Sequence, residues 1–264
     1  MGVVLAAVVW GLLALTVFFM AQGVGWMQPT LSEAAERIDA QLFLTLWVTG
    51  FAFVLVQFTL GWFIFRFRDR GTGRASYVHG HTGVEVAGIV ATTVTFVTLG
   101  IMGQMVWADV HLSGTDPDAV HIEVTGEQFV WNMRYPGPDG AFGSTSPDLY
   151  EAVGNTVGIV PDDPSGKDDF IVQNMMVVPV NRPIELTLRS KDVLHNFYVA
   201  GLRIKQDAVP GLHVPLRFTP HTAGEYEIAC AELCGLGHYR MRAVFKVVSA
   251  SDYSTWLVDQ QIAQ

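Results

Sequence analysis

Residues 230–241 read Cys230-Ala-Glu-Leu-Cys234-Gly-Leu-Gly-His238-Tyr-Arg-Met241, with the spacing C-x3-C-x3-H-x2-M. They include both cysteines of the 264-residue chain, and His195 lies upstream at the start of a β-rich run. Thiolates and a thioether beside imidazoles select copper over harder metal ions. Such a loop keeps its ligands in place only if a rigid scaffold holds both of its ends. The stretch therefore predicts a copper site on the loop that joins the last two strands of a β-domain.

The ligand set exceeds the needs of a single copper ion. A mononuclear blue-copper site uses two histidines, one cysteine and a weak axial methionine, and this chain offers a second cysteine. Two thiolates can bridge two ions, each with one terminal histidine, His195 or His238. Met241 would then be the weak ligand of one ion, and the backbone carbonyl of Glu232 that of the other. We predict a dinuclear copper centre that carries one electron at a time and binds no substrate.

Two other interpretations of the cysteine pair stay open at this point. Two cysteines in an exported domain usually form a disulfide, although a bridge would leave the neighbouring histidine and methionine unexplained. A zinc ion would suit two cysteines and two histidines, although zinc gains little from methionine.

The apolar residues are concentrated in the first half of the chain. Residues 42–65 and 86–107 carry no charge, and each stretch is long enough to span a bilayer as a helix. We predict a transmembrane hairpin over residues 28–107. Residues 1–27 form a third uncharged stretch, which we interpret as an additional spanning helix. A cleaved signal segment is the alternative, although it would require a basic start and a small-residue cleavage site.

Charge in the connecting loop predicts the orientation of the hairpin. The loop over residues 66–82 has an excess of arginine: Arg66, Arg68, Arg70 and Arg74 against Asp69. The positive-inside rule places this loop in the cytoplasm. Residues 108–264 would then form a domain on the periplasmic or outer face of a bacterial-type inner membrane.

From about residue 119, short β-rich runs alternate with turn residues, which predicts a β-sandwich or barrel. A closing helix is expected over Ser251–Ile262, and residues 136–168, rich in Gly, Pro and Asp, predict a long surface insertion. The predicted strands are His121–Val124, Phe129–Tyr135, Phe170–Val180, Ile184–Leu188, His195–Val199, Arg217–Thr219, Tyr226–Cys230 and Met241–Val248. The predicted fold class is thus an α + β membrane protein.

The formal net charge is -9, which argues against nucleic acid as a partner. An acidic outer domain could steer a basic soluble protein toward it. Ordinary solubility of an exported domain explains the charge equally well.

Over residues 35–262 the chain resembles subunit II of the haem-copper cytochrome c oxidases. The copper run is the most specific element of this resemblance. The others are a helical hairpin, His81-x3-Glu85, Gly126-Glu-Gln-Phe-Val-Trp131, Asp192-Val-Leu-His195 and Ile204-Lys-Gln-Asp-Ala-Val-Pro-Gly211.

The resemblance implies a cupredoxin-like Greek-key β-barrel with a dinuclear copper A centre. The Glu232 side chain would also reach a magnesium ion at the boundary with subunit I, or else be an exposed loop carboxylate. The positions that match the family's copper ligands are His195, Cys230, Glu232, Cys234, His238 and Met241.

Three further positions match functional sites of that family. Glu85 corresponds to a carboxylate near the cytoplasmic mouth of a proton pathway, and a carboxylate in a span is costly unless it is solvated or used. A simple interfacial anchor is the alternative. Phe129 and Trp131 correspond to electron-entry aromatics, although Phe129 replaces the first of two tryptophans, and both residues could serve core packing.

The resemblance implies the electron-entry subunit of a respiratory terminal oxidase. Cytochrome c would deliver electrons to the copper pair, which passes them to haem in subunit I for oxygen reduction coupled to proton pumping. The expected partners are subunit I, subunit III, membrane lipid and a separate cytochrome c or cytochrome c-bearing subunit, because no C-x-x-C-H motif is present. Catalytic residues are not expected in this chain. The alternatives are the copper A-bearing small subunit of a nitric oxide reductase, a metal-free quinol-oxidase subunit and a copper-delivery protein.

Overall fold

The computed structural model describes the chain except for residues 23–26, 72, 74–76, 78, 113, 115, 152–153 and 263–264, and it gives Asp109 as backbone only. Arg74 of the predicted arginine loop lies outside the described residues. The chain forms two compact units. One comprises Met1–Gln28 and Asp39–Val106, and the other comprises Pro29–Ile38 and Trp107–Gln264.

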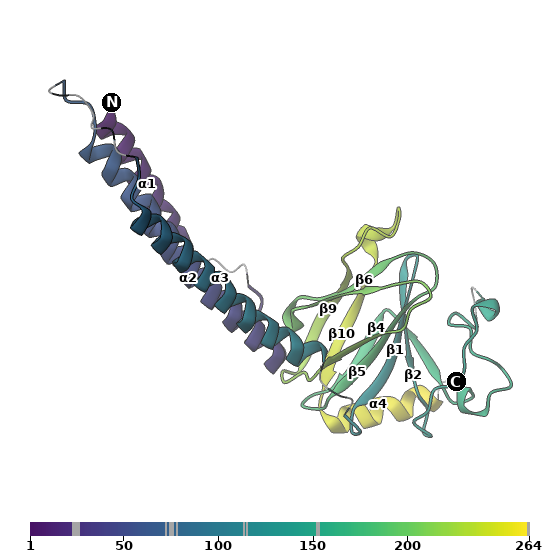
Figure 1. Ribbon diagram of the computed structural model, residues 1–264. Coiled ribbons are helices and arrows are strands. Elements are labelled where there is room, and N and C mark those ends of the chain that lie inside the picture. The colour runs from purple at the N-terminus through teal and green to yellow at the C-terminus, as the bar shows by residue number, and fades with distance from the viewer. Residues whose placement is uncertain are drawn as a thin grey trace. The chain divides into compact units, whose positions relative to one another are not determined.

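The first unit is helical. It contains α1 (Gly2–Ala21) and most of α2 (Glu33–Arg66) and α3 (Thr82–His111), drawn as long ribbons in Figure 1. All three helices are long and apolar enough to cross a membrane. The uncharged runs at 42–65 and 86–107 lie inside α2 and α3, and both helices extend beyond them into charged ends such as Arg66. Most of the apolar side chains of these helices are exposed on the surface of the unit. This is the arrangement expected of helices that are surrounded by the hydrocarbon core of a bilayer.

Helix α1 packs on α2 through a tryptophan that fits against a glycine. The Trp10 indole stacks on Phe58 with 5.8 Å between ring centroids, and its Nε1 donates to the Phe58 carbonyl over 3.3 Å. A Cβ added to Gly61 would lie 2.4 Å from Trp10 Nε1. The close approach of the two helices therefore depends on the absence of a side chain at Gly61.

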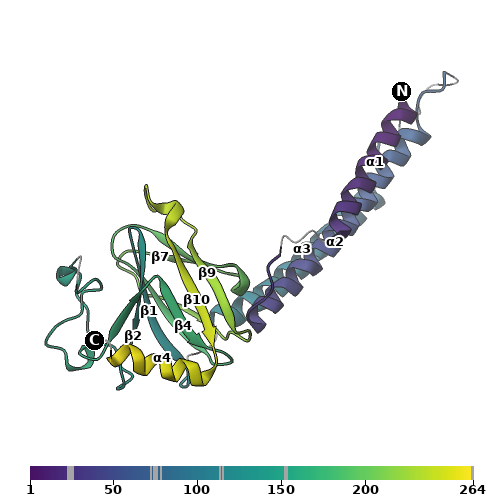
Figure 2. The same ribbon diagram turned by 180° about the vertical axis from the view of Figure 1, so that it is seen from behind.

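The second unit is a sandwich of two five-stranded sheets, seen from both sides in Figures 1 and 2. The first sheet has the order β3 (Phe170–Gln173), β2 (Val130–Tyr135), β1 (Val120–Glu127), β5 (Ile184–Ser190) and β8 (Val214–Phe218). The second has the order β4 (Met175–Pro179), β10 (Arg242–Val248), β9 (Gly224–Cys230), β6 (His195–Val199) and β7 (Ile204–Ala208). Helix α4 (Ala250–Ile262) follows the last strand.

Alternating side chains from the two sheets fill the core. In β10 the inward residues are Ala243, Phe245 and Val247, with exposed or half-buried residues between them. Trp131 from the first sheet meets Phe197 from the second in an edge-on contact with 5.9 Å between centroids. Burying each large apolar side chain contributes about 1.5–3 kcal/mol. The predicted fold class is confirmed, with a β-domain that is a two-sheet sandwich.

The predicted strand over 170–180 is two strands in different sheets. Asn174 separates them with a φ of 55°, a left-handed conformation that short polar side chains tolerate. Its Oδ1 accepts from the Trp131 backbone N–H over 3.0 Å, which fixes the turn. Strand β7 was not among the predicted strands, because Ile-Lys-Gln-Asp-Ala lacks an apolar alternation.

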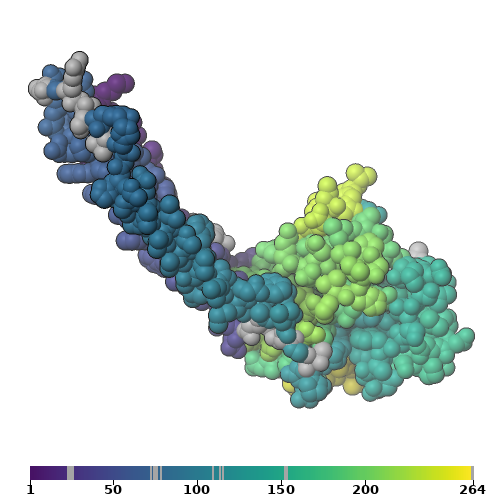
Figure 3. Space-filling model, in the orientation of Figure 1, coloured from purple at the N-terminus to yellow at the C-terminus, as the bar shows by residue number. Residues whose placement is uncertain are grey.

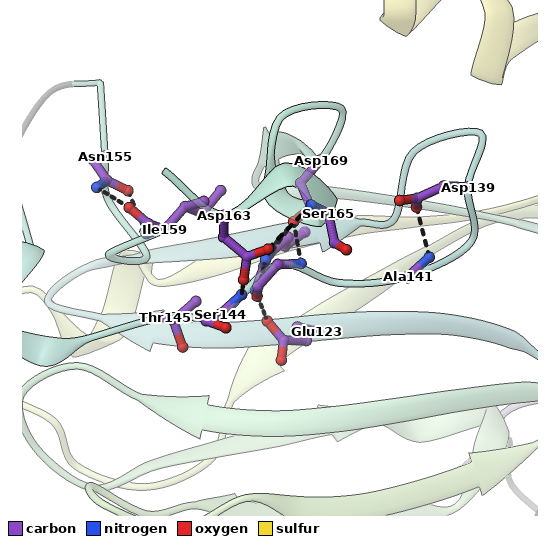
Figure 4. A network of polar contacts seen from close by, with 12 residues as sticks. Glu123, Asp139, Ala141, Ser144, Thr145, Asn155, Ile159, Asp163, Ser165 and Asp169 are labelled. Carbon is purple, nitrogen blue, oxygen red and sulfur yellow. Dashed lines mark hydrogen bonds and ion pairs between the residues drawn. The ribbon is translucent and has the colours of Figure 1, made fainter. Parts of the chain in front are cut away.

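A buried arginine ties the insertion at 136–168 to the first sheet, through the carboxylates of Glu123 and Asp169 that are labelled in Figure 4. Arg134 donates to Glu123 over 2.7 Å and to the Gly143 carbonyl over 2.5 Å, and it also pairs with Asp169. The same carboxylate accepts the Gly143 N–H over 3.0 Å. Within the insertion, Thr145 and Ile159 form an isolated β-bridge. The described part of the insertion is held to the first sheet by the hydrogen bonds and the ion pair of Arg134 and Asp169.

The segment Pro29–Ile38 belongs to the β-unit and fixes the start of α2. The Leu31 N–H donates to the Gly201 carbonyl over 2.9 Å, and the Leu31 carbonyl accepts from His221 over 2.8 Å. Ser32 Oγ accepts from the Ala35 N–H over 3.1 Å, which is a helix N-cap. The end of α3 belongs to the same unit. The start of α2 and the end of α3 are therefore both part of the unit that contains the β-domain.

Candidate metal centre

The predicted metal residues meet at one end of the β-sandwich. His195 is the first residue of β6, and Cys230 is the last residue of β9. Cys234, His238 and Met241 lie in the connection from β9 to β10, which stands out from the sandwich at the end opposite α4 (Figures 1 and 3). The β6–β9 pairing sets Phe197 opposite Cys230. Strand register thus brings His195 to the cysteine loop.

Both cysteines are free thiols. One ligand atom each from His195, Cys230 and Cys234 lies within 4.8 Å of the others. These three side chains and Met241 are buried, and His238 is half-buried. The donors therefore converge in a site largely closed to water.

The donors divide into two groups of similar composition. Cys230 Sγ lies 3.9 Å from His195 Nδ1 and 3.2 Å from the Glu232 carbonyl oxygen. Cys234 Sγ lies 3.7 Å from His238 Nδ1 and 3.6 Å from Met241 Sδ. Each thiol thus has one imidazole and one weak donor beside it.

The two thiols differ in acidity. Burial raises the pKa of Cys230, but hydrogen bonds with His195, His238 and the backbone of Asn196 and Glu232 together lower the pKa to about 6. Burial raises the pKa of Cys234, and the neighbouring charge of Cys230 adds to it, to about 11. One thiolate and one thiol therefore share the metal-free site at neutral pH.

A carboxylate orients the histidine of β6. Asp192 Oδ1 lies 2.8 Å from His195 Nε2, so the ring directs Nδ1 toward Cys230. Burial lowers the pKa of His195, but the hydrogen bonds with Cys230 and Asp192 outweigh it and leave the pKa raised. Asp192 was not among the predicted site residues, although it belongs to the Asp192-Val-Leu-His195 stretch. An acidic residue three positions before a ligand histidine, at the start of a strand, was the available signal.

The donor set fits copper better than the alternatives. Two thiols and a thioether are soft donors and two imidazoles are borderline, so the backbone carbonyl is the one hard donor in the set. Met241 Sδ lies 3.6 Å from Cys234 Sγ, and a thioether is not among the usual ligands of zinc. The free thiols give no support to a disulfide.

The electron-entry candidates take different positions. Trp131 is fully buried, and its ring lies edge-on to His195 with 5.9 Å between centroids. Phe129 is half-buried in the turn between β1 and β2. A Cβ added to Gly237 would lie 2.3 Å from Phe129 Cδ2, so the Phe129 ring lies against the cysteine loop. Of the two aromatics, Phe129 is therefore the one that is partly exposed to solvent.

The two carboxylates of interest lie in separate units. Glu232 is half-buried between the two cysteines and contributes its carbonyl to the site. Glu85 is in the first turn of α3. A Cβ on Gly80 would lie 2.5 Å from Glu85 Oε1, which places this carboxylate against the loop that precedes α3.

Fold and site together define a membrane protein with a cupredoxin-like external domain that carries a candidate copper site. The family model "Cytochrome C oxidase subunit II, periplasmic domain" matches residues 120–248. The alternative cytochrome c oxidase subunit 2 of Bradyrhizobium diazoefficiens is 36% identical over 238 residues, which cover 89% of this chain and 84% of that protein. The chain belongs to the cytochrome c oxidase subunit II family, whose members are parts of a respiratory oxidoreductase complex, and the predicted resemblance is confirmed.

Other relatives agree. Cytochrome c oxidase subunit 2 of Cereibacter sphaeroides is 30% identical over 251 residues, which cover 87% of this chain and 78% of that protein. A crystal structure of the periplasmic domain of cytochrome oxidase subunit II from Bradyrhizobium japonicum has 26% identity and a TM-score of 0.42 and covers 57% of this chain and 99% of that one. The curated relatives named here are oxidase subunits, so the comparisons do not favour the nitric oxide reductase alternative.

Proposed function

We propose that this chain accepts electrons at a dinuclear copper A centre and passes them to haem in subunit I of a proton-pumping terminal oxidase. The observation that carries the proposal is the convergence of two free thiols, with an imidazole and a weak donor beside each. When bound, a copper pair supplies one-electron redox chemistry. The proposed ligands are His195, Cys230, Glu232 through its carbonyl, Cys234, His238 and Met241.

The chain's own residues hold the donors in place. His195 is fixed by Asp192 and by the pairing of β6 with its neighbours. Cys230 is fixed by β9, whose N–H at this residue donates to the Met241 carbonyl over 3.1 Å. The fully buried Trp131 excludes water from the His195 side. A rigid, dry donor set keeps reorganisation small, which is what fast electron transfer needs.

Exposed apolar residues at the tip support a protein partner there. Leu233, Leu236 and Tyr239 are 77%, 98% and 80% exposed around the candidate site. Solvent-exposed apolar groups of this size mark interaction surfaces. We propose that this end of the domain meets subunit I and the electron donor, cytochrome c or a cytochrome c-bearing subunit, with Phe129 on the entry route. Subunit III would complete the complex.

The other assignments follow from the same family. We propose that the Glu232 side chain binds magnesium at the boundary with subunit I, and that Glu85 opens a proton pathway on the cytoplasmic side. The proposed organisation is an additional helix in residues 1–27, a hairpin in 28–107 and a periplasmic domain in 108–264, in a bacterial-type inner membrane. The fit of Trp10 against Gly61 supports retention of the first helix.

Electron paramagnetic resonance on the copper-loaded full chain in detergent tests the copper assignment. We expect one unpaired electron shared by two copper nuclei, which gives a multiline pattern. Cys234→Ser should reduce the pattern to that of one copper. A wild-type chain that takes up a single copper ion, or prefers zinc, would refute the assignment.

A further inference from the structure

A glutamine in the turn between β1 and β2 contacts both halves of the candidate copper site. The Gln128 side-chain amide Nε2 donates to the Cys234 carbonyl over 2.5 Å. The Gln128 backbone N–H donates to Asp192 Oδ2 over 2.8 Å. Asp192 in turn holds the His195 ring through its other oxygen. One residue outside the donor set is therefore connected to Cys234 directly and to His195 through one carboxylate.

The cysteine loop is shaped to receive this glutamine. Gly235 has a φ of +137°, and a Cβ there would lie 2.7 Å from Gln128 Nε2 and 3.1 Å from Phe129 Cζ. The left-handed region and the tight contact both favour glycine. The backbone after Cys234 thus leaves space for the side chains of the β1–β2 turn.

The two thiols differ in how the backbone supports them. Cys230 ends a paired strand, and its N–H is bonded to the Met241 carbonyl. Cys234 lies in the β9–β10 connection, where the neighbouring backbone bonds join nearby residues, such as His238 N–H to the Gly235 carbonyl over 3.1 Å. Gln128 supplies a long-range bond at the less supported cysteine.

We propose that Gln128 is a positioning residue of the copper site. It fixes Cys234 relative to His195, because its side chain bonds the Cys234 carbonyl and its backbone N–H bonds Asp192, the carboxylate that holds His195. The inference rests on the proposed function of the site. Groups that orient metal ligands typically change metal affinity 10–100-fold when they are removed. The glutamine contributes geometry and is not itself a metal ligand.

Copper release into an excess of a copper chelator tests this in the full chain. Gln128→Leu keeps the approximate size and removes the donor, and Gln128→Glu keeps the shape and replaces the donor with an acceptor. We expect both variants to lose copper about tenfold faster than the wild type and to show altered copper hyperfine splittings. The thermal midpoint of the metal-free chain should stay within about 2 °C of the wild type, since surface changes have small effects on stability.

Gln173→Leu is the matched control, because Gln173 lies on β3 and its amide donates to Asn132 on β2 over 2.9 Å rather than to the cysteine loop. It should release copper at the wild-type rate. The inference is overturned if Gln128→Leu or Gln128→Glu releases copper at the wild-type rate. It is also overturned if the faster copper release of both variants is matched by a lower thermal midpoint of the metal-free chain, because a loss of stability would then explain it. A wild-type chain without a copper pair would overturn the proposed function and this inference together, whereas a normal wild-type pair with unaffected variants would overturn the inference alone.

Discussion

Asp192 and His195 form a hydrogen-bonded pair at the start of β6, with 2.8 Å between Asp192 Oδ1 and His195 Nε2. The pair leaves Nδ1 of the imidazole directed at the sulfur of Cys230. Because the carboxylate occupies one ring nitrogen, the other is free to act as a donor to a metal ion. The orientation of His195, a proposed copper ligand, is therefore set by Asp192, which is not itself a proposed ligand.

Replacing this carboxylate should weaken copper binding without unfolding the domain. We expect Asp192→Ala to lower copper affinity about 10–100-fold, because the His195 ring loses its anchor. Asp192→Asn retains an acceptor and should recover part of the loss. Equilibrium competition with a chelator measures both. Asp148→Ala, at an exposed acidic residue in the insertion, is the control, and an equal loss there would contradict the prediction.

Copper binding should strengthen as pH rises. Burial raises the pKa of Cys234 to about 11, whereas several hydrogen bonds, the one with His195 foremost, together outweigh burial and lower the pKa of Cys230 to about 6. Between about pH 7 and about pH 9 the Cys234 thiol still holds its proton, whereas the Cys230 thiol has lost its own. Binding must release the Cys234 proton, and also that of His195 where this imidazole, whose pKa is raised, is still protonated. Affinity should therefore rise at least about tenfold per pH unit. Competition titrations across this range measure the slope, and a flat profile would exclude the assignment of Cys234 as the protonated ligand.

Breaking the charge cluster under the insertion should destabilise the β-domain. Arg134 is 1% exposed and bonds Glu123, Asp169 and the Gly143 carbonyl. We expect Arg134→Met to cost about 3–5 kcal/mol, because two carboxylates lose their buried partner. Chemical unfolding of the full chain and protease cleavage within residues 136–168 would report the change.

The matched change is Lys246→Met. Its ammonium pairs with Glu225 over 2.9 Å at the surface, where both side chains are largely exposed, and such a pair contributes about 0–1 kcal/mol. Similar losses for the two variants would show that the buried cluster does not anchor the insertion.

The contact between α1 and α2 should depend on one glycine. We expect Gly61→Val to destabilise the helical unit by about 1–3 kcal/mol, because the new side chain would overlap Trp10. Gly50→Val on the same helix is the control, since a Cβ there meets nothing within 4 Å. Thermal unfolding in detergent, with protease sensitivity of the N-terminal segment, measures both. Equal behaviour of the two variants would mean that α1 does not pack as described.

The helical part was largely predictable from the sequence. Uncharged runs at 42–65 and 86–107 can be stable only in lipid or a core, and the helices α2 and α3 contain them. The ends were less predictable, because the hydropathy signal stops at the first charges, whereas the helix of α2 continues from its Ser32 cap to Arg66. The β-runs were also visible, but the split at Asn174 was not, since it depends on a bond to Trp131.

Residue types and spacing alone predicted the donor set, because few ions use two cysteines, two histidines and a methionine together. Only the tertiary structure decided how those donors divide into two groups, since strand register and loop path set which imidazole faces which thiol. The same holds for Asp192, Gln128 and Gly61. Their roles come from partners far away in the chain or across a turn, and such contacts exist only once the strands and helices have packed.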